Sequence, residues 1–96
     1  MKRHAYLILA HKNFAQLRKL VELLDDSRND IFIHVDRKAR FNPDEWKDVC
    51  KYSSLSFIEP RIHVNWGGVS IMRVELALLK AATAAGHYDY YHLLSG

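Results

Sequence analysis

Four short groups of polar or glycine residues could take part in ligand chemistry, and each one follows an apolar run. They are His11-Lys12, Asp36-Arg37-Lys38, Asn65-Trp66-Gly67-Gly68 and Ser95-Gly96. A carboxylate in such a place accepts hydrogen bonds from a ribose hydroxyl or a base N–H. Paired glycines before a helix let backbone N–H groups approach an anion, and a tryptophan face stacks on a base or a sugar ring. Together, these groups indicate a site for a nucleotide or another anionic ligand.

Each of these residues also has a purely structural interpretation, and the residues alone leave both interpretations open. Asp36 could cap a turn or pair with Arg37 or Lys38. Gly67-Gly68 could serve only as the start of a helix, and Trp66 could be an aromatic residue of the core.

The four groups would share one edge of a sheet if each apolar run is a parallel strand. Strands are predicted at residues 5–10, 31–35, 55–59 and 88–94, with a brief further strand at 62–64. The first run is continuously apolar, which is typical of a strand buried on both faces. In open α/β sheets, ligands bind beyond the carboxyl ends of the strands, at the switch in strand order.

Helical periodicity fills the gaps between the strands and predicts helices at residues 14–24, 43–51 and 71–86. Asn13, Asn42 and Ser70 are the expected N-caps, and Pro43 suits the first position of the second helix. The alternation predicts an α/β fold with a Rossmann-like parallel sheet, flanking helices and right-handed crossovers. Because the last strand ends the chain, we expect one face of the sheet to be partly uncovered, and we interpret residues 1–96 as the N-terminal portion of a larger enzyme domain.

The composition describes one small domain with a slightly basic surface. Its 96 residues include 14 Lys and Arg against 11 Asp and Glu, a net charge of +3 that favours an anionic ligand or surface. No apolar run approaches the roughly 20 residues of a membrane-spanning helix, and the N-terminus does not resemble a signal peptide. We expect a cytoplasmic location, with the inner face of the membrane as the alternative. The single cysteine, Cys50, excludes an internal disulfide and is expected to be a small buried residue on the second helix.

Several well-defined motifs are absent from the sequence. It contains neither the dinucleotide fingerprint G-x-G-x-x-G, nor the phosphate loop G-x-x-x-x-G-K-[ST], nor the G-x-S-x-G elbow. It also lacks an Asp-x-Asp pair that could hold a divalent metal on a diphosphate. The histidines have no metal-ligand spacing, and His34, His63 and His92 are predicted to be structural residues inside strands. We therefore expect no metal site and no cofactor.

Four blocks of the sequence resemble the core-2/I-branching glycosyltransferases, the family of branching β-1,6-N-acetylglucosaminyltransferases and peptide O-xylosyltransferases. The blocks are residues 5–13 (AYLILAHKN), 30–39 (DIFIHVDRKA), 64–70 (VNWGGVS) and 88–96 (YDYYHLLSG). They occur in the family's order and span nearly the whole chain, which makes the resemblance specific. The compact start is similar to that of bacterial members.

The resemblance implies the N-terminal half of a GT-A type domain that binds a UDP-sugar. It also implies an inverting, metal-independent transfer of a sugar, GlcNAc or xylose, to a hydroxyl of a glycan or a protein. Asp36 would meet the uridine, the backbone of Ala10 and His11 would edge the base, and Trp66 with Gly67 would line the donor pocket. Arg37 would assist, with Lys38 as the alternative. The family's glutamate base and the basic residues that steady the diphosphate are expected beyond Gly96. No catalytic residue is therefore assigned within the chain, and the chain alone is expected to transfer no sugar.

Two other classes of function compete with this interpretation. A non-catalytic Rossmann-like nucleotide-binding module would share the fold, but a receiver domain would need acidic residues where His11 and Lys12 follow the first strand. A nucleic-acid-binding domain would need its basic residues gathered on one face, whereas here they are dispersed along the chain. We therefore expect a UDP-sugar donor and a glycan or protein acceptor as partners, and we expect no nucleic-acid partner. A peripheral association with a membrane stays open.

Overall fold

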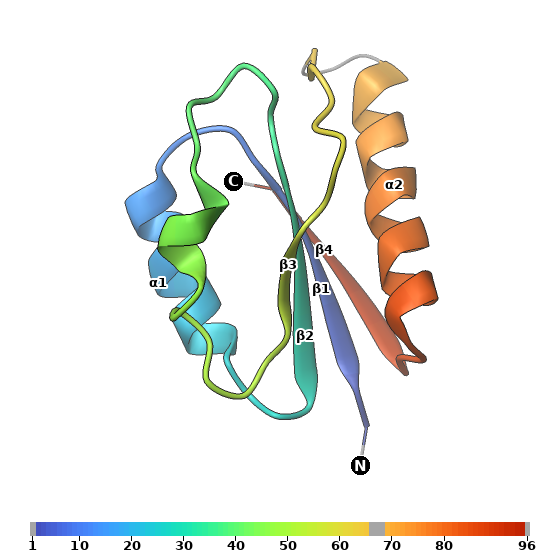
Figure 1. Cartoon of the computed structure of the whole chain (residues 1–96). Helices are drawn as coiled ribbons and strands as arrows, with labels where there is room; N and C mark the ends of the chain where they lie inside the picture. The colour runs from blue at the N-terminus through green and yellow to red at the C-terminus, as the bar shows by residue number, and fades with distance from the viewer. Residues whose placement is uncertain (1, 66–68, 96) are drawn as a thin grey trace.

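Two helices flank a four-stranded parallel sheet in the computed structural model, which describes residues 2–65 and 69–95 (Figure 1). The elements are β1 (His4–Ala10), α1 (Phe14–Leu24), β2 (Asn29–Val35), a 3₁₀ helix (Pro43–Trp46), β3 (Leu55–Phe57), α2 (Val69–Ala85) and β4 (Tyr90–Ser95). The strand order is β3-β2-β1-β4, and every neighbouring pair is parallel. The expected α/β, Rossmann-like arrangement is therefore confirmed.

The two helices lie on opposite faces of the sheet, and this places a switch in strand order beside β1 (Figure 1). The connection from β1 to β2 runs through α1 on one face, whereas the connection from β3 to β4 runs through α2 on the other. The two crossovers therefore diverge between β1 and β4. In open α/β sheets this point, at the carboxyl ends of the strands, is where ligands bind.

Strand β1 is buried on both faces, as its apolar run predicts, and it contributes to two hydrophobic clusters. The cluster on the α1 side includes Ile8, Leu17, Val21, Ile31 and Ile33. The cluster on the α2 side includes Leu7, Phe32, Val74, Leu78 and Ala82. Strand β4 is an edge strand, and its Tyr91 and Leu93 are exposed, in line with the expected partial cover of the sheet.

The second predicted helix is wrong in length. Only the 3₁₀ turn Pro43–Trp46 forms, although Asn42 does cap it by accepting a hydrogen bond from the backbone N–H of Asp44 at 3.0 Å. Trp46 and Val49 bury their side chains in the α1-side cluster, and the Val49 N–H bonds the carbonyl of Trp46 three residues earlier. A spacing of three suits a 3₁₀ turn rather than a longer α-helix.

Cys50 therefore lies in a loop and not on a helix, where it is partly buried. Burial, reinforced by the negative charge of Asp25, raises the pKa of its thiol to about 11. The thiol is thus protonated near neutral pH and is not an activated nucleophile.

The predicted strand at residues 62–64 is also wrong, because residues 61–65 form no strand. His63 is consequently exposed in a loop rather than placed in a strand. The third strand ends at Phe57 instead of residue 59, and β4 begins at Tyr90 instead of residue 88. Tyr88 turns into the core instead, where its hydroxyl donates a hydrogen bond to Asp30.

Two of the predicted helix caps use different chemistry from that expected. Asn13 occupies the N-cap position of α1 in the left-handed conformation (φ 57°), and its side chain makes no capping hydrogen bond. Ser70 lies inside the first turn of α2. Its hydroxyl accepts from the backbone N–H of Asn65 at 2.8 Å and donates to the Asn65 carbonyl at 3.1 Å, so it fastens the preceding loop to the helix.

Candidate functional site

The carboxyl ends of β1 and β2 lie side by side and bring two of the predicted site positions together. Ala10 pairs with Val35, and the next residue, Asp36, donates its backbone N–H to the Ala10 carbonyl at 2.9 Å. Ala10 and Asp36 are both buried, while His11 is partly exposed. The structure therefore places Ala10, His11 and Asp36 at one edge of the sheet, as the sequence predicts.

The carboxylate of Asp36 is almost fully enclosed, with 2% of the residue exposed. Its Oδ1 accepts hydrogen bonds from two backbone N–H groups, Lys38 at 3.1 Å and Val64 at 3.2 Å. The Lys38 ammonium lies 3.5 Å from Oδ2. Burial by itself would raise the pKa of this carboxyl, but the two backbone hydrogen bonds and the Lys38 charge outweigh it and hold the pKa below its ordinary value.

The two cations that follow Asp36 have different roles. Lys38 donates from Nζ to the carbonyl of Val64 at 2.8 Å, so its side chain bridges Asp36 and the loop that precedes α2. About half of the Lys38 side chain is exposed. Arg37 is exposed at the rim, and only its backbone N–H is engaged, with the Ile62 carbonyl at 3.1 Å. The Arg37 guanidinium is therefore accessible to an anion in solvent.

Two residues of this edge were not singled out as site residues by the sequence analysis. Arg61 donates to the carbonyls of Val35 at 3.1 Å and Asp36 at 2.7 Å, and also to that of Ala39. His34 accepts the backbone N–H of Ile62 on Nε2 at 2.8 Å, which confirms its structural role. The sequence alone does not indicate that either residue belongs to the site, because the hydrogen-bond partners of both are backbone groups about 25 positions away.

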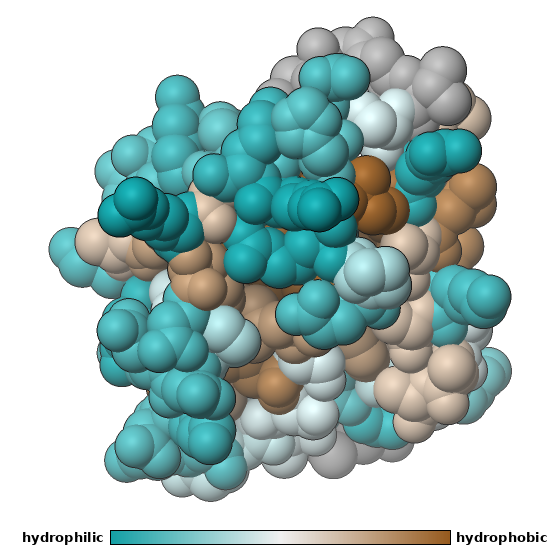
Figure 2. All heavy atoms as spheres, turned by 45° about the horizontal axis from the view of Figure 1, so that its top comes forward, coloured by the Kyte–Doolittle hydropathy of each residue, from teal (hydrophilic) through white to brown (hydrophobic). Residues whose placement is uncertain are grey.

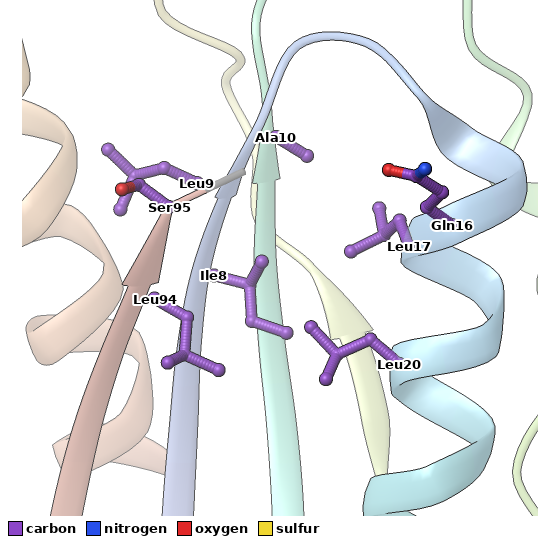
Figure 3. Close-up of a pocket in the computed structure, with 8 residues that line it drawn as sticks. All are labelled: Ile8, Leu9, Ala10, Gln16, Leu17, Leu20, Leu94 and Ser95. Atoms are coloured by element: carbon purple, nitrogen blue, oxygen red, sulfur yellow. The ribbon is translucent and has the colours of Figure 1, made fainter.

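A cavity of about 170 Å³ lies at the switch point, on the α1 face (Figure 3). It is lined by Ile8, Leu9, Ala10, Gln16, Leu17, Leu20, Leu94 and Ser95. Leu17 and Leu20 of α1 point toward Ile8 and Leu94 of the sheet, and the Gln16 amide lies beside Leu17 (Figure 3). Its lining is mainly apolar, and its volume is below the roughly 300 Å³ at which typical small-molecule pockets begin.

The surface above the carboxyl ends of the strands is mostly hydrophilic, with apolar side chains visible between the polar ones (Figure 2). Trp66 and Gly67, predicted to line the donor pocket, lie outside the described residues. Within residues 2–65 and 69–95, no group of three or more His, Cys, Asp or Glu side chains is arranged to hold a metal ion. No helix in this part of the chain is long and apolar enough to cross a membrane.

His92, predicted to be structural, belongs to a small group of rings at the opposite end of the sheet. Its Nε2 lies 2.9 Å from Nδ1 of His4, and its ring stacks on Tyr6 with centroids 4.6 Å apart. Both histidines are partly buried by these contacts. The pair lies at the start of β1, far along the strand from Ala10, and so does not belong to the site at the carboxyl edge.

Comparison with known proteins gives one result that bears on identity. A family model, the Core-2/I-Branching enzyme, matches residues 4–96. No curated protein matches the chain. Because the matched region covers nearly the whole sequence, the chain belongs to the core-2/I-branching enzyme family of glycosyltransferases.

Proposed function

We propose that this chain binds the nucleotide of a UDP-sugar at the carboxyl edge of its sheet, as the donor side of an inverting, metal-independent glycosyltransferase. The sugar is GlcNAc or xylose, and the acceptor is a hydroxyl of a glycan or a protein. Membership of a glycosyltransferase family supports the reaction class. The geometry around Asp36 supports the position of the donor.

The arrangement of the two Asp36 oxygens is the observation that carries this proposal. Oδ1 already accepts two backbone N–H groups, whereas among the described residues Oδ2 is approached by one group, the Lys38 ammonium, at 3.5 Å. Movement of the half-exposed Lys38 side chain would open Oδ2 to a ligand donor. The uracil N–H and the ribose hydroxyls are donors of the required kind.

A diphosphate next to this position would meet positive charge. The exposed guanidinium of Arg37 is one residue from Asp36 and can bind a phosphate through two parallel N–H groups. In a transfer without a metal, such cations stabilise the negative charge that develops on the departing UDP. Arg37 would therefore assist in neutralising the diphosphate.

Asp36 is unsuited to act as the general base of the transfer. Its hydrogen bonds hold its pKa low, so the carboxylate is a weak proton acceptor near neutral pH. We therefore assign Asp36 to donor binding and not to proton transfer from the acceptor hydroxyl.

The test is calorimetric titration of the chain with UDP, with and without EDTA, and with CDP for comparison. The proposal predicts saturable UDP binding that survives EDTA, is weaker for CDP because cytosine lacks the imide N–H, and weakens by about tenfold or more in Asp36→Ala. Asp44→Ala, which removes a carboxylate at an exposed position, serves as the control. Absence of UDP binding, or binding that EDTA abolishes, would contradict the proposal.

A further inference from the structure

The Arg61 guanidinium donates hydrogen bonds to three backbone carbonyls of the turn that contains Asp36. Nε donates to Val35 O at 3.1 Å, and Nη2 donates to Asp36 O at 2.7 Å and also to Ala39 O. None of these three acceptors is a carboxylate. The charge of Arg61 is thus used to fix the backbone of residues 35–39 and not to form an ion pair with an acidic side chain.

The four backbone N–H groups of this turn, from Asp36 to Ala39, also have partners. The N–H of Asp36 bonds the Ala10 carbonyl, and the N–H of Ala39 bonds the Asp36 carbonyl, each at 2.9 Å. The N–H of Arg37 bonds Ile62 O, and that of Lys38 bonds the Asp36 carboxylate. Hydrogen bonds within the chain therefore restrain the backbone of the turn without a ligand.

The same contacts tie the turn to the loop that leads into α2. Besides Arg61 itself, Ile62 donates to His34, Val64 donates to Asp36, and the Val64 carbonyl accepts from Lys38. Residues 36–39 and 61–64 consequently form one hydrogen-bonded unit, which we call the clamped loop pair. Asp36 makes four hydrogen bonds within this unit, and Arg61 makes two, to the carbonyls of Asp36 and Ala39, besides its bond to the adjoining Val35.

We propose that Arg61 is a positioning residue of the donor site. It sets the orientation of the Asp36 carboxylate for a nucleoside diphosphate without touching the ligand, and this role rests on the proposed function above. The planar fork of arginine suits the task because it aims several N–H donors in fixed directions at separate acceptors. A lysine would supply the charge without that fixed geometry.

The preorganisation has a thermodynamic consequence for binding. If the clamped loop pair can adopt several conformations in the absence of Arg61, a ligand must select the competent one, and the apparent affinity falls by the fraction of the population that is competent. Loss of Arg61 should therefore weaken nucleotide binding even in a protein that remains folded.

The experiment compares UDP binding by the wild type, Arg61→Met, Arg61→Lys and Arg40→Met, at a temperature at which all of them are folded by circular dichroism. Arg40 is the matched control, because it is an exposed arginine next to the same turn. We expect the dissociation constant to rise about ten- to hundredfold in Arg61→Met and by a smaller factor in Arg61→Lys, with a change of less than about threefold in Arg40→Met.

A second readout separates positioning from general stability. Amide hydrogen exchange should accelerate at Lys38 and Val64 in the Arg61 variants and stay unchanged in the β1–β2 ladder, since only the clamped loop pair loses its donor. If Arg61→Met does not fold, the same comparison is made with Arg61→Lys.

The outcomes separate this proposal from the one on which it rests. If the wild type binds UDP and both Arg61 variants bind it equally well, the role of Arg61 is refuted while the donor site stands. If the wild type does not bind UDP, both proposals fail. If Arg40→Met and Arg61→Met weaken UDP binding equally, loss of positive charge explains the effect, and the positioning role of Arg61 is overturned.

Discussion

Strand β2 has a buried aspartate at each end, and the two carboxylates differ in the partners of their Oδ2 atoms. Asp30, at the start of the strand, is 9% exposed, and Asp36, just past its end, is 2% exposed. Oδ2 of Asp30 accepts two short hydrogen bonds of 2.6 Å, from the Arg3 guanidinium and the Tyr88 hydroxyl. Within residues 2–65 and 69–95, Oδ2 of Asp36 has one partner, a lysine ammonium at 3.5 Å.

Burial alone therefore does not distinguish the two carboxylates, and their hydrogen-bond partners do. The Asp30 site is closed: Arg3 lies over the Tyr88 ring at 4.8 Å, and Oδ1 is used by the backbone N–H of Ser54 at 3.0 Å. Oδ2 of Asp36 has a single, more distant cation, Lys38, where Oδ2 of Asp30 has two short hydrogen bonds. It also lies at the carboxyl edge of the sheet, where ligands bind in this class of fold. Asp30 joins separate parts of the chain, whereas Oδ2 of Asp36 is the oxygen that we propose for ligand binding.

The largest effect is expected from Asp30→Ala. The substitution leaves the Tyr88 hydroxyl buried without its acceptor and also removes the charge partner of Arg3, so we expect a loss of about 2–4 kcal/mol in the free energy of unfolding. Urea denaturation followed by circular dichroism measures it. A loss below about 1 kcal/mol would show that this end of the sheet does not depend on Asp30.

A smaller effect is expected from Tyr88→Phe, which keeps the ring against Phe32 and Arg3 but removes the hydroxyl. Burial, followed by the hydrogen bond to Asp30, raises the pKa of Tyr88 to about 12, so the hydroxyl is a donor throughout the useful pH range. We expect a loss of about 1 kcal/mol in the free energy of unfolding. UDP affinity should not change, and a clear change there would contradict the separation between the two ends of β2.

The smallest effect concerns pH at the Asp36 end. Burial is the main cause that lowers the pKa of His34 below its ordinary value of 6.5, and the neutral ring is the form that accepts the Ile62 N–H. Below pH 6.5 the unfolded chain binds a proton that the folded chain resists. The free energy of unfolding therefore falls with decreasing pH until the folded pKa is reached, and then levels off.

The variant His34→Gln tests this pH dependence, because its amide oxygen can accept the same N–H and does not titrate. We expect the stability of the wild type, relative to that of the variant, to decrease between pH 7 and pH 5, as measured by thermal denaturation. Parallel pH profiles for the two proteins would show that His34 does not control the loss.

Much of the fold could be predicted because its signals are local. The apolar run of β1, the helical spacing of Leu17 and Val21, and the polar residues after β2 each report their own structure. The same logic located Ala10, His11 and Asp36 at one edge of the sheet. The error at residues 43–51 arose because the capping signal at Asn42 and Pro43 starts a turn but does not determine how long it continues.

The network around Asp36 could not be predicted in the same way. Arg61 is an ordinary charged residue in the sequence, and its acceptors are carbonyls, which every residue possesses. The Asp30–Tyr88 pair spans 58 positions and depends on the parallel alignment of the strands. Such contacts depend on the tertiary fold, so a local sequence pattern does not predict them.

The measurement that tests the account most directly compares UDP affinity and melting temperature in Asp36→Asn and Asp30→Asn. In Asp36→Asn the amide oxygen can keep the two backbone N–H groups on Oδ1, which places an NH₂ donor where a ligand donor should bind. We predict that Asp36→Asn keeps a melting temperature close to that of the wild type and loses UDP affinity by about tenfold or more, whereas Asp30→Asn melts earlier and binds UDP normally. Undiminished UDP binding by Asp36→Asn, or loss of binding only in Asp30→Asn, would contradict the account.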